Sequence, residues 1–249
     1  MEDFNRHNQE IHQNLQYWQR KKILREIYSG FYREILKQVD KSLPGKIVEI
    51  GSGIGNLKMV LPECICTDVF ANSWIDQVEN AYRLSFADRS VSHLILFDVW
   101  HHLQYPRQVM EEFKRVLVPG GRVIIFEPCI GLMGAAVYGW FHKEPVAWFD
   151  RIERGYREDI ENFGYYAAQG NATRIFGSSE YKDIYAGFSM MYKRKYSALA
   201  YVLSGGYSGR QFYPDCFYKG LKGMEKWLDR MPWLFATRML VVLKKGDNE

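Results

Sequence analysis

Apolar residues near the start of the chain recur at steps of three and four positions. The series comprises Ile11, Leu15, Trp18, Leu24, Tyr28, Phe31, Ile35 and Val39. Charged residues fill the positions between them, which is the pattern of an amphipathic helix. The sequence therefore predicts helical structure over residues 10–40, ended by a turn at Pro44-Gly45.

Beyond residue 45 the pattern changes to short β-branched stretches that alternate with helical ones. Strands are predicted at 46–50, 64–69, 93–99, 122–126 and 236–244. A helix is predicted at 106–117, where proline stands in the first turn, and a turn at 118–121. This alternation indicates an α/β fold: a doubly wound, Rossmann-like sheet, mostly parallel with one antiparallel strand, an N-terminal helix and a helical lid insertion.

The strand–helix rhythm is interrupted between residues 129 and 235, where most of the aromatic side chains lie. Two interpretations stay open for this stretch: an aromatic-rich core under a helical subdomain, or a lid whose aromatic walls receive a substrate. The predicted organisation is an N-terminal helical segment (1–44), an α/β core (45–128 and 236–249), and an insertion or lid that forms the substrate-binding region (129–235).

The most informative segment is 48–56, Val-Glu-Ile-Gly-Ser-Gly-Ile-Gly-Asn, in which a strand leads into three glycines at alternate positions. Glycine lets the backbone approach a ligand closely, and a turn that opens a helix offers free N–H groups. A nucleotide-like ligand is expected at the carboxyl end of this first strand. A tight turn without a ligand is the alternative. A dinucleotide fingerprint would need glycine at position 56, where Asn56 stands.

This spacing resembles the first motif of class I S-adenosylmethionine-dependent methyltransferases, and three later stretches extend the resemblance. Residues 80–88 are similar to the family's D-A-x-x-L-P-F-x-D stretch, with Asn80 in place of Asp and Ser85 in place of Pro. Residues 97–103 resemble the end of the fourth strand in the subgroup of the ubiquinone/menaquinone C-methyltransferases. Residues 117–122 match the L-x-P-G-G turn. The resemblance covers residues 45–128 and the last strand.

The resemblance implies S-adenosylmethionine as cofactor. The implied cofactor-binding residues are Glu49, Gly51, Ser52, Gly53, Gly55, Asp68, Val69, Asn80, Ala81, Phe97 and Asp98. Asp68 would hold the ribose hydroxyls, since a carboxylate accepts two hydrogen bonds from a vicinal diol. The amide oxygen of Asn80 would accept from the adenine amino group. Asp68 could instead be a surface carboxylate at a strand end, and Asp98 could instead be a helix N-cap.

Candidates for a general base are His101 and His102, with His142 as a third from the insertion. The favoured alternative makes His101 and His102 a structural pair beside the cofactor pocket. Glu127, at the end of the fifth predicted strand, could face the transferred methyl, and tyrosines of the insertion could position a substrate.

Composition narrows the partners and the location. A net charge of +4 without a dense Lys/Arg block argues against nucleic acid. The four cysteines lack metal-ligand spacing, so no metal is expected and the thiols are expected to be reduced, as in a cytoplasmic protein. The N-terminus does not resemble a signal peptide.

Two segments bear on contact with a membrane. The apolar run 129–141 is shorter than the about 20 residues that a membrane span needs, but it could dock peripherally at an interface. The basic run 193–195 is expected on a solvated face, with a phosphate-bearing or membrane-proximal substrate as the alternative.

The predicted function is methyl transfer from S-adenosylmethionine to an oxygen of a small-molecule or lipid- or sugar-linked acceptor. Methyl transfer places the enzyme in class EC 2.1.1. Two other classes compete with it. A nicotinamide-dependent oxidoreductase is disfavoured by Asn56, and a non-catalytic scaffold or partner subunit that keeps the fold is favoured only by Asn80.

Overall fold

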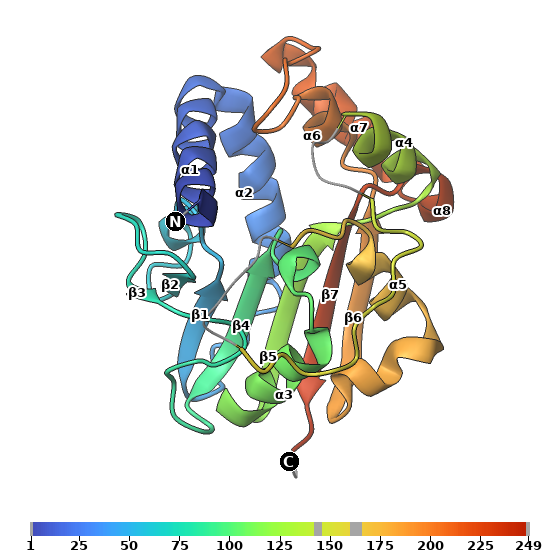
Figure 1. Cartoon of the computed structure of the whole chain (residues 1–249). Coiled ribbons are helices and arrows are strands. Elements are labelled where there is room, and N and C mark those ends of the chain that lie inside the picture. Colours follow the sequence, from blue (N-terminus) through green and yellow to red (C-terminus); the bar gives the residue numbers. More distant parts are fainter. Residues whose placement is uncertain (1, 142–145, 160–165, 248–249) are drawn as a thin grey trace.

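A seven-stranded sheet organises the computed structural model, which describes residues 2–141, 146–159 and 166–247 (Figure 1). The strands are β1 Lys46–Ile50, β2 Ile65–Asp68, β3 Gln77–Val78, β4 Val91–Phe97, β5 Leu117–Pro128, β6 Phe188–Tyr196 and β7 Arg238–Lys245. Their order is β3-β2-β1-β4-β5-β7-β6. Only β7 runs antiparallel to its neighbours, β5 and β6, so the predicted Rossmann-like sheet is confirmed.

The middle of the sheet is buried on both faces. Leu94, Ile95 and Leu96 of β4 are fully buried, as a strand between two helical layers requires. On one face they pack with Phe113 of α3 (Pro106–Val116), and on the other with Leu24 of α2 (Lys22–Leu36). The predicted turn 118–121 lies inside β5, where the pairing register slips between Val91–Leu117 and His93–Arg122.

The predicted N-terminal helix is two helices, α1 Glu2–Arg20 and α2 Lys22–Leu36. The helix is interrupted at Lys21, whose φ of −98° and ψ of 95° are extended, and the second helix ends at Leu36. The expectation of one continuous helical pattern over 10–40 therefore missed the break, because neither proline nor glycine marks it.

Residues 129–235 contain several short helices and one strand of the sheet. The helices are α4 Leu132–Phe141, α5 Asn171–Gly177, α6 Leu199–Leu203, α7 Tyr218–Leu228 and α8 Pro232–Phe235, with 3-10 turns η3 Ser179–Tyr185 and η4 Asp215–Phe217. The strand is β6, which carries the basic run 193–195 along the sheet edge. Residues 201–206 form the end of α6 and a turn. Assignment of the whole range to a lid stays a prediction.

Candidate functional site

The three glycines of the loop after β1, Gly51, Gly53 and Gly55, all have positive φ. A Cβ on Gly51 would lie 2.5 Å from Cγ2 of Val99, so this glycine is needed for close packing of the loop against the chain that follows β4. Gly53, at φ 53°, differs, because a Cβ there would meet no atom within 4 Å. The loop is thus packed on one side and open at Gly53, which fits the close approach of a ligand to its backbone.

Only a short turn follows the glycine loop, where the sequence predicted the opening of a helix. The four residues of η1 (Asn56–Met59) form a 3-10 turn that begins after Gly55. Leu57 and Leu61 enter the core, and Pro62 follows directly. The chain therefore reaches β2 without a full helix, and the N–H groups of Ser52, Gly53 and Gly55 are bonded to Thr67, Asp68 and Ser52.

Asp68 joins the ends of β1 and β2. Its carboxylate is 3% exposed; Oδ2 accepts from the N–H of Gly53 at 3.0 Å and Oδ1 from the N–H of Val69 at 2.7 Å. The neighbouring Ser52 N–H donates to the carbonyl of Thr67 at 2.8 Å, which holds the loop on β2. The structure therefore brings Gly53, Asp68 and Val69 together, as expected, and Asp68 is not a free surface carboxylate.

Glu49 lies below the loop. Its side chain is buried, with Oε2 3.7 Å from the Cys66 thiol on β2, and burial raises the pKa of its carboxyl well above its usual range. Protonated, Glu49 costs less to bury than a carboxylate would. A contact between Glu49 and a cofactor stays a prediction.

The turn after β3 contains Asn80 and Ala81. Asn80 Oδ1 accepts from the N–H of Tyr82 at 3.0 Å, while Ala81 is buried. The preceding Glu79, which the sequence did not single out, is also buried and accepts from the N–H of Ser85 at 2.8 Å. This carboxylate stabilises the turn that presents Asn80.

Asp98 directly follows β4 and lies in the left-handed region at φ 57°. It does not cap the following 3-10 turn η2 (Trp100–His102), whose N-cap is Val99, so the N-cap hypothesis is wrong. Asp98 instead forms an ion pair with the buried Arg238 of β7. Burial raises the pKa of Asp98, and Arg238 opposes that rise. Neither the residue Arg238 nor the pair was predicted.

Glu127 holds η2 and one of the two histidines. This fully buried carboxylate accepts from the N–H groups of Val99 at 2.7 Å and Trp100 at 2.6 Å, and it lies 2.7 Å from Nδ1 of His101. Its carboxylate is therefore engaged with this turn and with an imidazole. The contact positions the ring of His101, and a role of Glu127 facing the transferred methyl stays a prediction.

The two histidines lie with their ring centres 4.1 Å apart, but they have different partners. His101 is buried against Glu127, while Nδ1 of His102 lies 2.9 Å from the carbonyl oxygen of Tyr166. His102 thus ties η2 to the insertion, consistent with the structural alternative. His142, the third candidate, lies outside the described residues.

Tyrosines from two distant parts of the chain contact one another next to the glycine loop. Tyr28 stacks on Phe97 at the end of β4, with ring centres 5.2 Å apart, and contacts Tyr207 at 5.3 Å. The hydroxyl of Tyr207 lies 3.4 Å from Nδ2 of Asn56, directly after the glycine loop. Tyr201 of α6 lies under the guanidinium of Arg238, 4.5 Å away. The site is covered by α2 and by the end of the insertion together.

Lys21 connects the start of α2 to the turn that contains Tyr207. From the break between α1 and α2, its ammonium donates to the carbonyls of Ser204, Gly206 and Gly209, at 2.9, 2.8 and 2.6 Å. Burial lowers the pKa of Lys21. The bonds hold the turn that presents Tyr207 over the glycine loop.

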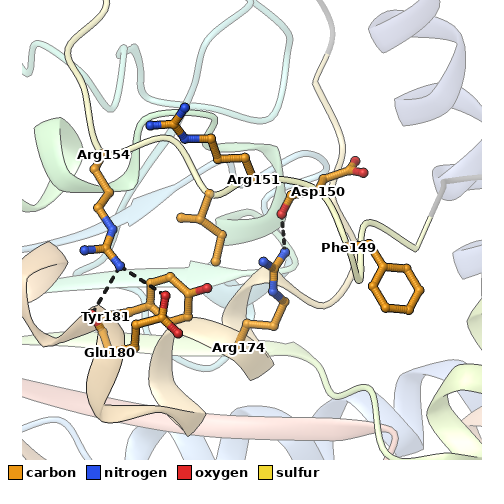
Figure 2. Close-up of a pocket in the computed structure, with 8 residues that line it drawn as sticks. Phe149, Asp150, Arg151, Arg154, Arg174, Glu180 and Tyr181 are labelled. Carbon is orange, nitrogen blue, oxygen red and sulfur yellow. Dashed lines mark hydrogen bonds and ion pairs between the residues drawn. The ribbon is translucent and has the colours of Figure 1, made fainter.

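Two surface cavities lie elsewhere. One, of about 290 Å³, is lined by Arg151, Arg154 and Arg174 with acidic neighbours (Figure 2). Arg174 is engaged with the carbonyls of Ala147 and Asp150, and Arg154 lies 3.5 Å from Glu180. The other, of about 330 Å³, lies between Arg89 and Lys245. Neither includes the glycine loop.

Two further searches concern the described part of the chain. Among these residues, no cluster of three or more His, Cys, Asp or Glu side chains is arranged to hold a metal ion. None of the helices described is both long and apolar enough to cross a membrane.

Residues 48–125 match the protein family described as "Methyltransferase domain". The match spans the glycine loop, Asp68, the Asn80 turn and β4, which are the elements that form the open site. No curated protein matches the sequence.

Solved structures share the fold at low identity. An S-adenosylmethionine-dependent methyltransferase from Thermotoga maritima has a TM-score of 0.58 at 13% identity, covering 95% of this chain and 99% of that one. A geranyl diphosphate methyltransferase in complex with S-adenosylmethionine gives 0.51 at 10%, covering 87% and 85%. A chain from the complex with the Haloferax volcanii methyltransferase activator Trm112 gives 0.50 at 14%, covering 86% and 87%. The domain match supports a methyltransferase with S-adenosylmethionine as methyl donor, and the solved structures show that the chain shares the fold of such enzymes.

Proposed function

We propose that this chain transfers a methyl group from S-adenosylmethionine to a hydroxyl oxygen of a small-molecule or lipid- or sugar-linked acceptor. The observation that carries the proposal is the arrangement at Gly53: an open approach to the backbone with the buried carboxylate of Asp68 3.0 Å from its N–H. A ligand that presents a diol to Asp68 and passes close to Gly53 fits this arrangement. Membership of the ubiquinone/menaquinone subgroup stays a prediction.

The residues around the loop fit the parts of this cofactor. Asp68 would exchange its bonds to backbone N–H groups, in part, for the ribose hydroxyls, since a carboxylate has about four acceptor positions. Asn80 and Ala81 would lie along the adenine, with Val69 beside it. Ser52, Gly51 and Gly55 would shape the loop, while Phe97 and Asp98 at the end of β4 would border the cofactor's sulfonium side.

The acceptor would enter between the tyrosines and η2. When bound, S-adenosylmethionine supplies a methyl carbon activated by a positive sulfur. The acceptor oxygen would bond to that carbon as the carbon–sulfur bond breaks, and the hydroxyl proton must leave. With Nδ1 of His101 turned to Glu127, Nε2 is the basic nitrogen of the ring, and we assign the proton to it. The tyrosines exclude water from the transfer.

A thermal-unfolding series tests the cofactor. Purified protein is heated with S-adenosylmethionine, S-adenosylhomocysteine or NAD, each at about 100 times a plausible Kd, where binding stabilises by about 2.7 kcal/mol. For a chain of this length the midpoint should rise by about 5–10 °C with both sulfur nucleotides and stay unchanged with NAD. No rise with any of them would overturn the proposal in favour of a non-catalytic scaffold.

A second experiment tests the acceptor atom. Protein and cofactor carrying an isotopically labelled methyl group are incubated with hydroxylated amphiphiles and sugars, and labelled products are located by mass spectrometry. A product whose label resides on oxygen supports the proposal. Label on carbon or nitrogen would refute the hydroxyl acceptor while leaving the cofactor assignment intact.

A further inference from the structure

Large apolar side chains are exposed at one end of the insertion. On α7 and α8, Trp227 is 57% exposed, Trp233 64% and Met224 44%. Leu132, at the start of α4, is 61% exposed. Single exposed apolar residues are ordinary in soluble proteins. Here two tryptophans and a methionine are exposed on α7 and α8, which follow each other in the chain, and the leucine lies at the start of α4, which packs against α8.

The side chains of α7 are sorted around its axis. Gly220, Gly223, Met224 and Trp227 follow the spacing i, i+3, i+4, i+7, and all four are exposed. Glu225 and Leu228 are buried, and α7 packs against α6. The exposed apolar stripe is therefore one continuous helix face, not a disordered edge.

Basic side chains run beside this apolar stripe. Lys219, Lys226 and Arg230 follow at spacings of seven and four residues and are exposed. Within the described residues none of the three is part of an ion pair. They border the stripe on one side, as basic residues do on helices that lie at a lipid interface.

The acidic residues of the same helix end turn inward. Glu225 is buried, accepts from the N–H of Ala200 at 2.8 Å and pairs with Lys222. Asp229 accepts from the N–H of Ser197 at 2.7 Å. Because these carboxylates are used inside the fold, the outward face of α7 carries the positive charge of its lysines without the negative charge of its acids.

The start of α4 and α8 extend the face. A Cβ on Gly131 would lie 3.1 Å from the carbonyl oxygen of Trp233, so Leu132 follows directly on a residue in contact with α8. Figure 1 shows α4, α7 and α8 gathered at one end of the molecule, next to α6. Tyr201 of α6 contacts Arg238, so this face adjoins the cover of the candidate site.

We propose that this face, formed by Leu132, Met224, Trp227 and Trp233 with Lys219, Lys226 and Arg230, docks on an anionic lipid bilayer. Tryptophan prefers the boundary between headgroups and acyl chains, and the basic stripe complements a negative surface. The uncompensated lysines beside two exposed tryptophans favour a lipid interface over a protein partner. Docking does not depend on the proposed methyl transfer, and it would bring the covered site close to a lipid-linked acceptor.

Vesicle co-sedimentation of the full chain tests the proposal. The vesicles are phosphatidylcholine alone, or phosphatidylcholine with one third phosphatidylglycerol. The apolar variant is W227S/W233S and the charge variant is K219E/K226E. The matched controls are M191S, an exposed apolar residue of β6, and K182E, an exposed lysine of η3. Circular dichroism and thermal midpoints establish that each variant is folded.

The wild type should bind the anionic vesicles at least tenfold more tightly than the neutral ones. Each basic residue near such a surface changes partition about fivefold, so K219E/K226E should lose at least 25-fold and W227S/W233S at least tenfold. Both controls should bind like the wild type. Absence of vesicle binding, equal binding to both vesicle types, or binding unchanged in the two patch variants would overturn the proposal, and retained binding of S-adenosylhomocysteine would show that the cofactor assignment is unaffected.

Discussion

Removal of the Glu127 carboxylate is expected to destabilise the end of β5 and the turn η2 strongly. In Glu127→Ala, the N–H groups of Val99 and Trp100 lose an acceptor inside the protein, and so does Nδ1 of His101. The carboxylate is fully buried, so water cannot replace it without opening the structure. The three donors would be left without partners in an apolar environment.

The magnitude follows from the count of donors. A buried donor without an acceptor costs about 1–3 kcal/mol, and partial relaxation lowers the sum, so the free energy of unfolding should fall by about 3–5 kcal/mol. For a chain of this length that loss corresponds to a fall of about 6–20 °C in the midpoint. The exposed Glu111 is the matched control, and Glu111→Ala should change stability by less than about 0.5 kcal/mol.

Urea unfolding followed by circular dichroism measures this difference. Glu127→Gln separates stability from positioning: its amide oxygen can still accept from both N–H groups, so the loss should stay below about 2 kcal/mol. Its NH₂ group, however, would donate to Nδ1 of His101, and the ring proton would move to Nε2. Methyl transfer should then fall by about 100-fold or more. An Ala variant within 1 kcal/mol of the wild type, or a Gln variant with full activity, would refute the reasoning.

Three further predictions concern other buried groups. Arg238→Met should lower the free energy of unfolding in urea by about 2–4 kcal/mol, because Asp98 loses its counter-ion, and adding Asp98→Asn should restore part of it. Burial lowers the pKa of His93 to about 4, so stability should be full above pH 6.5 and fall by up to about 3 kcal/mol toward pH 4; His93→Gln should flatten that pH profile. In the same urea assay, Lys21→Met should lower the free energy of unfolding by about 1.5–3 kcal/mol. Lys21→Arg should stay closer to the wild type.

Local patterns in the sequence were sufficient to predict the centre of the sheet. Strands β4, β5 and β7 contain the apolar runs LILF, VIIF and MLVVL because both faces of each are buried, and such runs are visible without a structure. The strand β6 was missed, since Lys193 and Arg194 interrupt its alternation. It lies at the edge of the sheet, where charged residues are tolerated and prevent further pairing.

The glycine loop and Asp68 were also predictable from the sequence, but the ion pair that borders the site was not. The spacing of Gly51, Gly53 and Asp68 places these residues at neighbouring strand ends in any parallel sheet. The pair of Asp98 with Arg238, by contrast, joins positions 140 residues apart, and no local pattern announces it.

The surface proposed for lipid docking was also not predictable from local sequence patterns. The sequence pointed to residues 129–141, whose composition is the most apolar of the chain. In the structure much of that segment packs inward, with the Tyr138 hydroxyl donating to the carbonyl of Thr237 at 3.0 Å. The exposed stripe of α7 is visible only once its buried side is known, because Glu225 occupies the buried side and Trp227 the exposed one.

Calorimetric titration of S-adenosylhomocysteine into the wild type, Asp68→Asn and Asp88→Asn tests the central claim most directly. Asp88 is an exposed carboxylate in an ion pair with Arg115, away from the glycine loop, and serves as the control. Loss of charge-assisted bonds to two ribose hydroxyls should weaken binding by Asp68→Asn about 10–100-fold. Asp88→Asn should bind like the wild type. Equal affinity in Asp68→Asn and the wild type would contradict the account of the site.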